Sequence, residues 1–62
     1  MVSEAVSVVE AHRRAGLPHE LGGPLLQAVY DGHIPSEPDP AGGPLPWVRV
    51  ADVESWAAAR AS

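Results

Sequence analysis

Apolar and polar side chains alternate with a helical period in the first quarter of the chain. Valines and alanines share one stripe of the helical wheel, and Glu10 and Arg14 form an i,i+4 pair in the favourable order. Ser3 is placed to cap such a helix, because its hydroxyl can accept from a free amide of the first turn. Gly16 suits the position just beyond a helix C-terminus. The pattern therefore predicts a helix over 3–15.

Two later segments show the same period. Over 24–31, Pro24 suits the first helical position, one arc of the wheel is apolar, and Gly32 follows as a stop signal. Over 52–61, Asp52 is a suitable cap and the apolar positions follow the i, i+3, i+4, i+7 rule. Both segments are therefore predicted to be helices that dock through one face.

The stretch between these helices has a different character. Residues 35–46 contain five prolines and two glycines, which rules out a helix or a central strand and predicts an extended loop. Residues 47–50 then read as a short strand, with Trp47 and Arg49 on one face.

Composition narrows the classes of protein that the 62-residue chain can represent. Eighteen side chains are large and apolar, which is enough for one small core, and the absence of cysteine excludes disulfides and thiolate zinc sites. No apolar run is long enough to cross a membrane and no secretory signal is recognisable, so a cytoplasmic protein is expected. The formal net charge of −4 disfavours non-specific binding to nucleic acid.

Two runs of residues, with the order of the segments, resemble a known family. The first is LLQAVYDGHIP at 25–35, and the second is WVRVADVESW at 47–56. They are similar to the winged helix-turn-helix modules of the excisionase and MerR-like family, in which a recognition helix ends before a Gly-polar-apolar-Pro turn. The resemblance implies a mainly α fold, a single domain over 1–62 with three helices and a two-stranded wing. It also implies a small non-catalytic DNA-binding protein, either an accessory factor of a phage or mobile element or a transcription regulator.

The resemblance and the residue types together give a set of candidate DNA contacts. The helix over 24–31 would enter the major groove, where Gln27 could read an adenine, and the other candidates would contact phosphate or the groove rim. The predicted set is Arg13, Arg14, Gly23, Gln27, Tyr30, His33 and Arg49.

Each candidate also has a plainer interpretation. Gln27 could be an ordinary exposed polar residue, and Arg13 and Arg14 could simply complement the dipole of the first helix. Arg49 could cover a tryptophan face instead of a phosphate, and Tyr30 could belong to the core or to the rim. The two tryptophans are expected to supply packing mass in preference to a base-stacking platform.

The charges depart from the family pattern and suggest a second function. The outward positions of the predicted recognition helix carry no Lys or Arg, and the wing offers Glu37 and Asp39 where the family offers basic residues. A monomer should therefore bind duplex DNA weakly and need self-association or a partner protein. Alternatively, Glu37 and Asp39 could form an acidic surface on a winged-helix scaffold that binds a protein.

Chemistry beyond binding is not expected. The three histidines, His12, His19 and His33, lie seven and fourteen residues apart, which fits no common metal-ligand spacing. The acids of the proline-rich loop lack the enclosed setting that acid-base catalysis needs. The sequence therefore predicts a binding protein with no metal and no cofactor.

Overall fold

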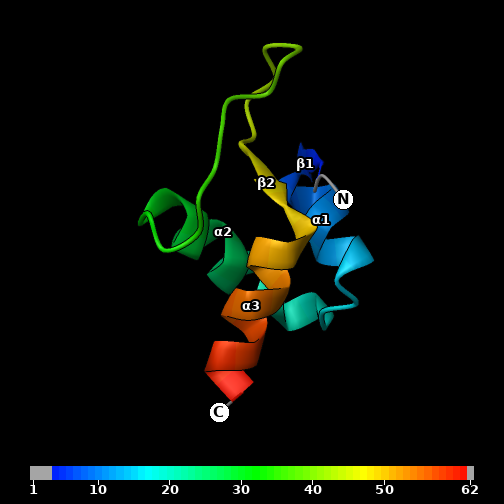
Figure 1. Cartoon of the computed structure of the whole chain (residues 1–62), viewed down its shortest axis with the longest axis vertical. Helices are drawn as coiled ribbons and strands as arrows, with labels where there is room; N and C mark the ends of the chain where they lie inside the picture. The colour runs from blue at the N-terminus through cyan, green and yellow to red at the C-terminus, as the bar shows by residue number, and fades with distance from the viewer. Residues whose placement is uncertain (1–3, 62) are drawn as a thin grey trace.

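The computed structural model describes residues 4–61, which form one layer of helices beside a small sheet (Figure 1). In chain order the elements are β1 (Ala5–Ser7), α1 (Val8–Arg14), the short 3-10 helix η1 (His19–Leu21), α2 (Gly22–Tyr30), β2 (Trp47–Arg49) and α3 (Val50–Ala61). The predicted mainly helical fold, with three α-helices and two antiparallel strands, is confirmed at this level.

The sheet joins two segments that lie far apart along the chain. Strands β1 and β2 pair antiparallel with Val6 opposite Val48 and Ser7 opposite Trp47. The prediction of helix from residue 3 was therefore wrong, because residues 5–7 are a strand and the helix begins at Val8. Pairing with a strand some forty residues away overrides the local helical period. Val6 is β-branched, and such a side chain fits a strand well and lowers helix propensity only slightly.

The cap of α1 follows from this shift. The hydroxyl of Ser7 accepts from the amide of Glu10 at 3.2 Å, so Ser7 is the N-cap. The predicted cap, Ser3, lies outside the described residues. The prediction that a serine caps the first helix is therefore confirmed, but the capping residue is Ser7 and not Ser3.

The other predicted boundaries differ by one or two residues. Helix α2 begins at Gly22 and ends at Tyr30, so Pro24 lies inside the first turn, where its missing amide costs no helical bond. Strand β2 ends at Arg49, and α3 begins at Val50, two residues before the predicted cap Asp52.

Gly32 ends the helical region as predicted, and it also directs the chain into the core. Its φ of 84° is a left-handed conformation, and the amide of the next residue, His33, donates to the carbonyl of Ala28 at 2.9 Å. The reversal places Ile34, which is 2% exposed, in the core with the buried side chains of the helices. A glycine is needed here because an L side chain rarely adopts this φ.

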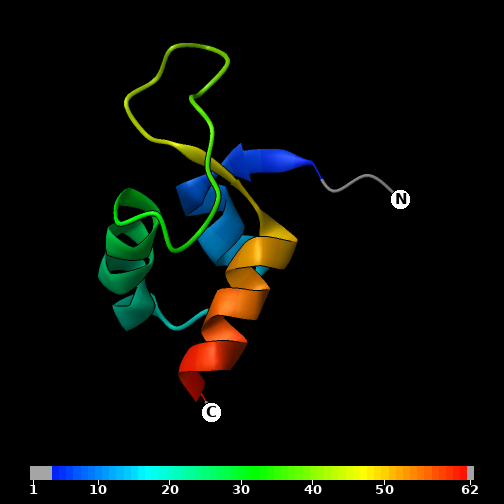
Figure 2. The ribbon, with the colours of Figure 1, turned by 60° about the vertical axis from the view of Figure 1, so that its left-hand side comes forward.

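Residues 35–46, hereafter the wing loop, project from the body of the molecule (Figures 1 and 2). At the base of the loop, Glu37 and Trp47 exchange two backbone hydrogen bonds, at 2.9 and 2.8 Å. At the tip, a carboxylate oxygen of Asp39 accepts from the amide of Ala41 at 2.8 Å and shapes the turn. The predicted two-stranded wing is thus reduced to a single bridge, because the prolines cannot donate to a ladder, and the second strand of the sheet is β1.

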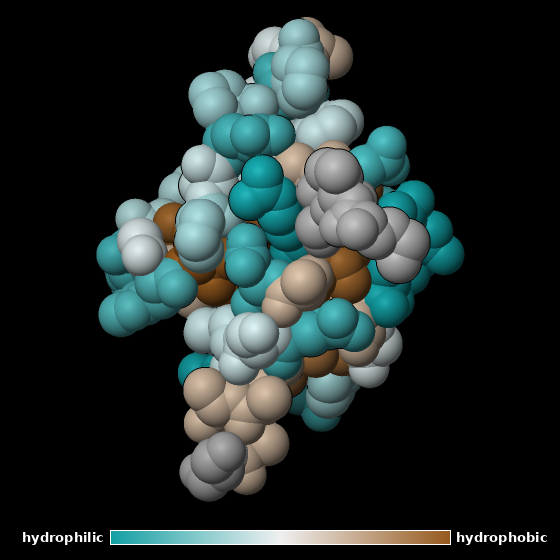
Figure 3. All heavy atoms as spheres, viewed as in Figure 1, coloured by the Kyte–Doolittle hydropathy of each residue, from teal (hydrophilic) through white to brown (hydrophobic). Residues whose placement is uncertain are grey.

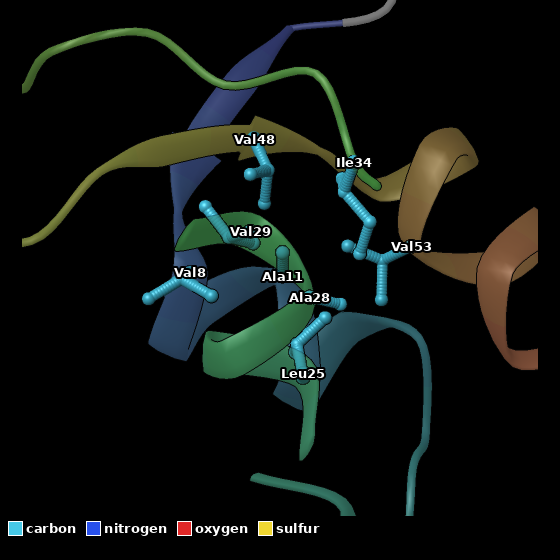
Figure 4. Packing of buried hydrophobic residues seen from close by; sticks show 8 residues of the cluster. All are labelled: Val8, Ala11, Leu25, Ala28, Val29, Ile34, Val48 and Val53. Atoms are coloured by element: carbon cyan, nitrogen blue, oxygen red, sulfur yellow. The ribbon is translucent and has the colours of Figure 1, made fainter. Parts of the chain in front are cut away.

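The core is aliphatic and draws on α1, α2, α3, β2 and Ile34 (Figure 4). Its buried residues are Val8, Ala11, Leu25, Ala28, Val29, Ile34, Val48 and Val53. The expectation that the tryptophans supply the main packing mass is met only in part. Trp56 is half-buried and packs against the core cluster, whereas Trp47 is half-buried and is not part of that cluster. Within residues 4–61, no helix has both the length and the apolar character to span a membrane.

A matched pair of valines tests the core assignment. Val53→Ala should lower the free energy of unfolding by about 2 kcal/mol, because Val53 is fully buried and a cavity is left behind. Val9→Ala should leave it unchanged or slightly raised, because Val9 is 63% exposed and alanine favours helix. Urea unfolding followed by tryptophan fluorescence measures both. Equal losses would contradict the assignment.

A matched pair of serines tests the cap. Ser7→Ala should cost about 1 kcal/mol of folding stability, since the amide of Glu10 loses its acceptor. The same change at Ser36, exposed at the base of the wing loop, serves as the control. Thermal unfolding by circular dichroism gives the comparison, and an unaffected Ser7→Ala protein would show that the cap contributes nothing.

Candidate functional site

Helix α2 is buried on one arc and exposed on two flanks that differ in character. Leu25, Ala28 and Val29 face the core, whereas Gln27 and Tyr30 are exposed. Gln27 lies on the flank toward α3, and Tyr30 lies on the flank toward the wing loop. Three of the seven predicted DNA contacts, Gln27, Tyr30 and His33, line these two flanks.

The flank toward α3 forms a shallow depression, hereafter the α2–α3 hollow. It is lined by Pro24, Gln27, Ala28, Asp31, His33, Trp56 and Arg60. The side-chain amide of Gln27 donates to a carboxylate oxygen of Asp31 at 3.0 Å, which orients the amide. The guanidinium of Arg60 lies over the ring of Trp56, 5.1 Å from its centroid. The hollow thus combines an oriented amide, an imidazole and an arginine stacked on an indole.

Arg60 was not among the predicted site residues, and a tryptophan contact was considered only for Arg49, as the alternative to a phosphate contact. A cation over a tryptophan was considered for Arg49, but the structure places Arg60 on Trp56. The signal was present in the sequence, because residues four apart on a helix lie on the same face. Arg60 was instead counted only as part of the periodic pattern of that segment.

Arg49 lies elsewhere, on the outer face of the sheet. It lines a small depression whose other lining residues include Glu37 and Asp52. The nearby acids lower the positive potential that a phosphate contact would need. The structure therefore does not bring Arg49 together with Gln27.

Arg13 and Arg14 are also separate from α2's exposed flanks. Both donate to one carboxylate oxygen of Glu10, in the case of Arg14 through Nε at 2.9 Å. The hydrogen bond from Arg13, followed by that from Arg14, lowers the pKa of the Glu10 carboxyl below its ordinary value. The predicted i,i+4 pair of Glu10 and Arg14 is thus confirmed, and Arg13 joins the same carboxylate.

The flank toward the wing loop, hereafter the α2–wing surface, is acidic and partly apolar. Tyr30 is 63% exposed there, beside Glu37, Asp39 and Leu45. None of the residues that line this surface is basic. Tyr30 is thus a rim residue and does not belong to the core. The carboxylate of Asp39 also has a structural task, because it shapes the loop tip.

A third depression, hereafter the α1–α2 groove, continues from the α2–wing surface. Its volume is about 260 Å³, and its lining is mostly apolar: Val8, Val9, His12, His19, Gly22, Leu25, Leu26 and Leu45. Leu45 lines both depressions. Figure 3 shows hydrophobic side chains reaching the surface over α2, near the base of the wing loop.

The remaining candidates have simple surroundings. Gly23 is exposed in the first turn of α2, and no neighbouring atom lies within 4 Å of the position a Cβ would take. His12 is hydrogen-bonded through Nε2 to the carbonyl of Pro18 at 2.9 Å. Over the described range 4–61, no three metal-ligating side chains are grouped so that they could hold an ion.

Comparisons with protein-family models, with curated proteins and with solved structures gave no match. Function is therefore inferred from the geometry and charges of these surfaces.

The ion-paired end of α1 gives a pH-dependent prediction. The carboxyl of Glu10 should titrate below its ordinary pKa, and the stabilisation from its two arginines should be present at neutral pH and lost as the pH falls through that lowered pKa. NMR titration of the side-chain carboxyl carbon of Glu10 measures this pKa. Arg13→Ala should raise the pKa of Glu10, whereas Arg60→Ala should not, and an unmoved pKa in the Arg13 variant would refute the pairing.

Proposed function

We propose that this chain is a small winged helix-turn-helix protein that binds duplex DNA as an accessory or regulatory factor, without catalysis. The arrangement supports this assignment: α2 follows α1 after residues 15–21, which include η1, it is exposed along two flanks, and the wing loop lies beside it. In such modules the second helix lies in the major groove while neighbouring segments contact the backbone. One fold can serve many functions, so the assignment depends on the exposed residues.

The observation that carries the proposal is the α2–α3 hollow. It gathers Gln27, His33 and Arg60 on one exposed flank of the helix that would enter the groove. The amide oxygen and amide hydrogens of a glutamine can match an adenine edge, and an arginine can hold a phosphate through paired N–H groups. In this assignment Gln27 reads a base, and His33 and Arg60 contact the backbone.

The charges set the strength of this interaction. Asp31 adds a carboxylate to the same hollow, and Arg13, Arg14 and Arg49 lie on other parts of the molecule. A monomer can therefore neutralise only a few phosphates, so its affinity should be low and should depend on assembly with further protein. The wing loop would stay off the backbone, because Glu37 and Asp39 would be repelled by it.

Salt titration of DNA binding tests the proposal. The affinity for duplex DNA at low ionic strength should fall with salt by a slope of about three phosphates or fewer per monomer. Arg60→Ala should reduce the slope by about one, whereas Arg49→Ala, the matched control, should change it little. Fluorescence anisotropy with cognate or random duplex measures the slope. Absence of binding to any duplex at low salt would refute the DNA-binding role.

A second candidate function, protein binding on the same scaffold, is favoured by the α2–wing surface. An exposed tyrosine beside an acidic, proline-rich loop is unsuited to DNA but typical of a protein contact, in which aromatic residues are enriched. The two functions use different flanks of α2 and are therefore compatible.

A further inference from the structure

Two large hydrophobic side chains are strongly exposed within residues 4–61, and they line two depressions that share Leu45. Val9 lines the α1–α2 groove, and Tyr30 lines the α2–wing surface. Leu26, half-buried, precedes Tyr30 by four residues and so shares its face of α2. Together with Leu45, these residues form one continuous apolar strip, defined here as Val9, Leu26, Tyr30 and Leu45.

The apolar strip has unlike charges at its two ends. Beyond Val9, Arg13 follows one helical turn later on α1, and it shares the single carboxylate of Glu10 with Arg14, so positive charge remains. Beyond Tyr30, Glu37 and Asp39 line the wing end of the strip. No basic residue lines the α2–wing surface with them. The strip is thus basic at the α1 end and acidic at the wing end.

We infer that the apolar strip is a self-association surface, on which a second copy of this chain docks antiparallel about a two-fold axis. An antiparallel arrangement places the acidic end of each copy against the basic end of the other, and it places Tyr30 of each copy at the groove beside Val9 of the other. Tyr30 and the α1–α2 groove lie on one surface of each copy, so the contact is reciprocal and the assembly closes as a dimer. The α2–α3 hollow remains open in this dimer.

The size of the molecule limits the strength of the contact. A standard interface buries about 800 Å² per partner, which is about a fifth of the 4184 Å² exposed by the chain. The apolar strip consists of four side chains, whereas a standard interface has about 20–30 residues on each side, so the dimer should be weak and its population should depend on concentration. The inference goes beyond DNA binding and does not depend on it.

Sedimentation equilibrium of the full chain without DNA tests the inference. The average mass should rise from 6.5 kDa towards twice that value between micromolar and millimolar concentration. Tyr30→Ser and Val9→Ser should each raise the dissociation constant at least tenfold. Both residues are exposed, so neither change should unfold the chain. Gln27→Ser, on the other flank of α2, is the matched control and should not change it.

A charge-exchange experiment tests the antiparallel arrangement and separates a lost contact from a lost fold. Arg13→Glu and Glu37→Arg should each dimerise more weakly than the original chain, whereas an equimolar mixture of the two variants should regain dimerisation through restored opposite pairs. A monomer at every concentration would overturn the inference, and so would unchanged dissociation constants in the Tyr30 and Val9 variants. Masses that grow beyond two copies would overturn the closed two-fold contact. All of these outcomes are independent of whether the protein binds DNA.

Discussion

Strand β2 is bonded along both edges, and the rest of the structure depends on this arrangement. One edge pairs with β1, and the other exchanges two backbone hydrogen bonds with Glu37 at the base of the wing loop. The inner side chain of β2, Val48, is 1% exposed and meets the helices, while α3 continues directly from the end of the strand. A segment of three residues therefore fixes the first strand, the wing loop and the last helix relative to one core.

The features that could be predicted from the sequence are those encoded by neighbouring residues. The apolar arc of α2 and the stop at Gly32 follow from local periodicity and from the conformational freedom of glycine, and the structure confirms both. Strand β1 could not be predicted in this way, because its partner lies far along the chain and three residues carry too little pattern to distinguish strand from helix. The same limit explains why the second strand was sought in the wing loop.

The candidate site was predictable to a similar extent. The outward direction of Gln27 follows from the helical wheel, whereas the surroundings of Arg49 depend on which strands pair and could not be read locally. The pairing of Arg60 with Trp56 was accessible, since both residues lie on one helix at the right spacing. The resulting picture is a helix, α2, with a polar flank that adjoins Arg60 of α3 and an apolar flank bordered by acids, a division that lets one short element serve two kinds of contact.

The separation of β1 from β2 along the chain also has a consequence for biosynthesis. During translation, Ala5 to Ser7 emerge early but have no partner until Trp47 to Arg49 leave the ribosome. Closing so long a loop costs entropy that only the completed sheet and core repay. The α1 and α2 segments are too short to persist as isolated helices, so residues 5–46 should remain largely unstructured until β2 has left the ribosome. Folding of these elements is therefore expected to be all-or-none and to wait for β2.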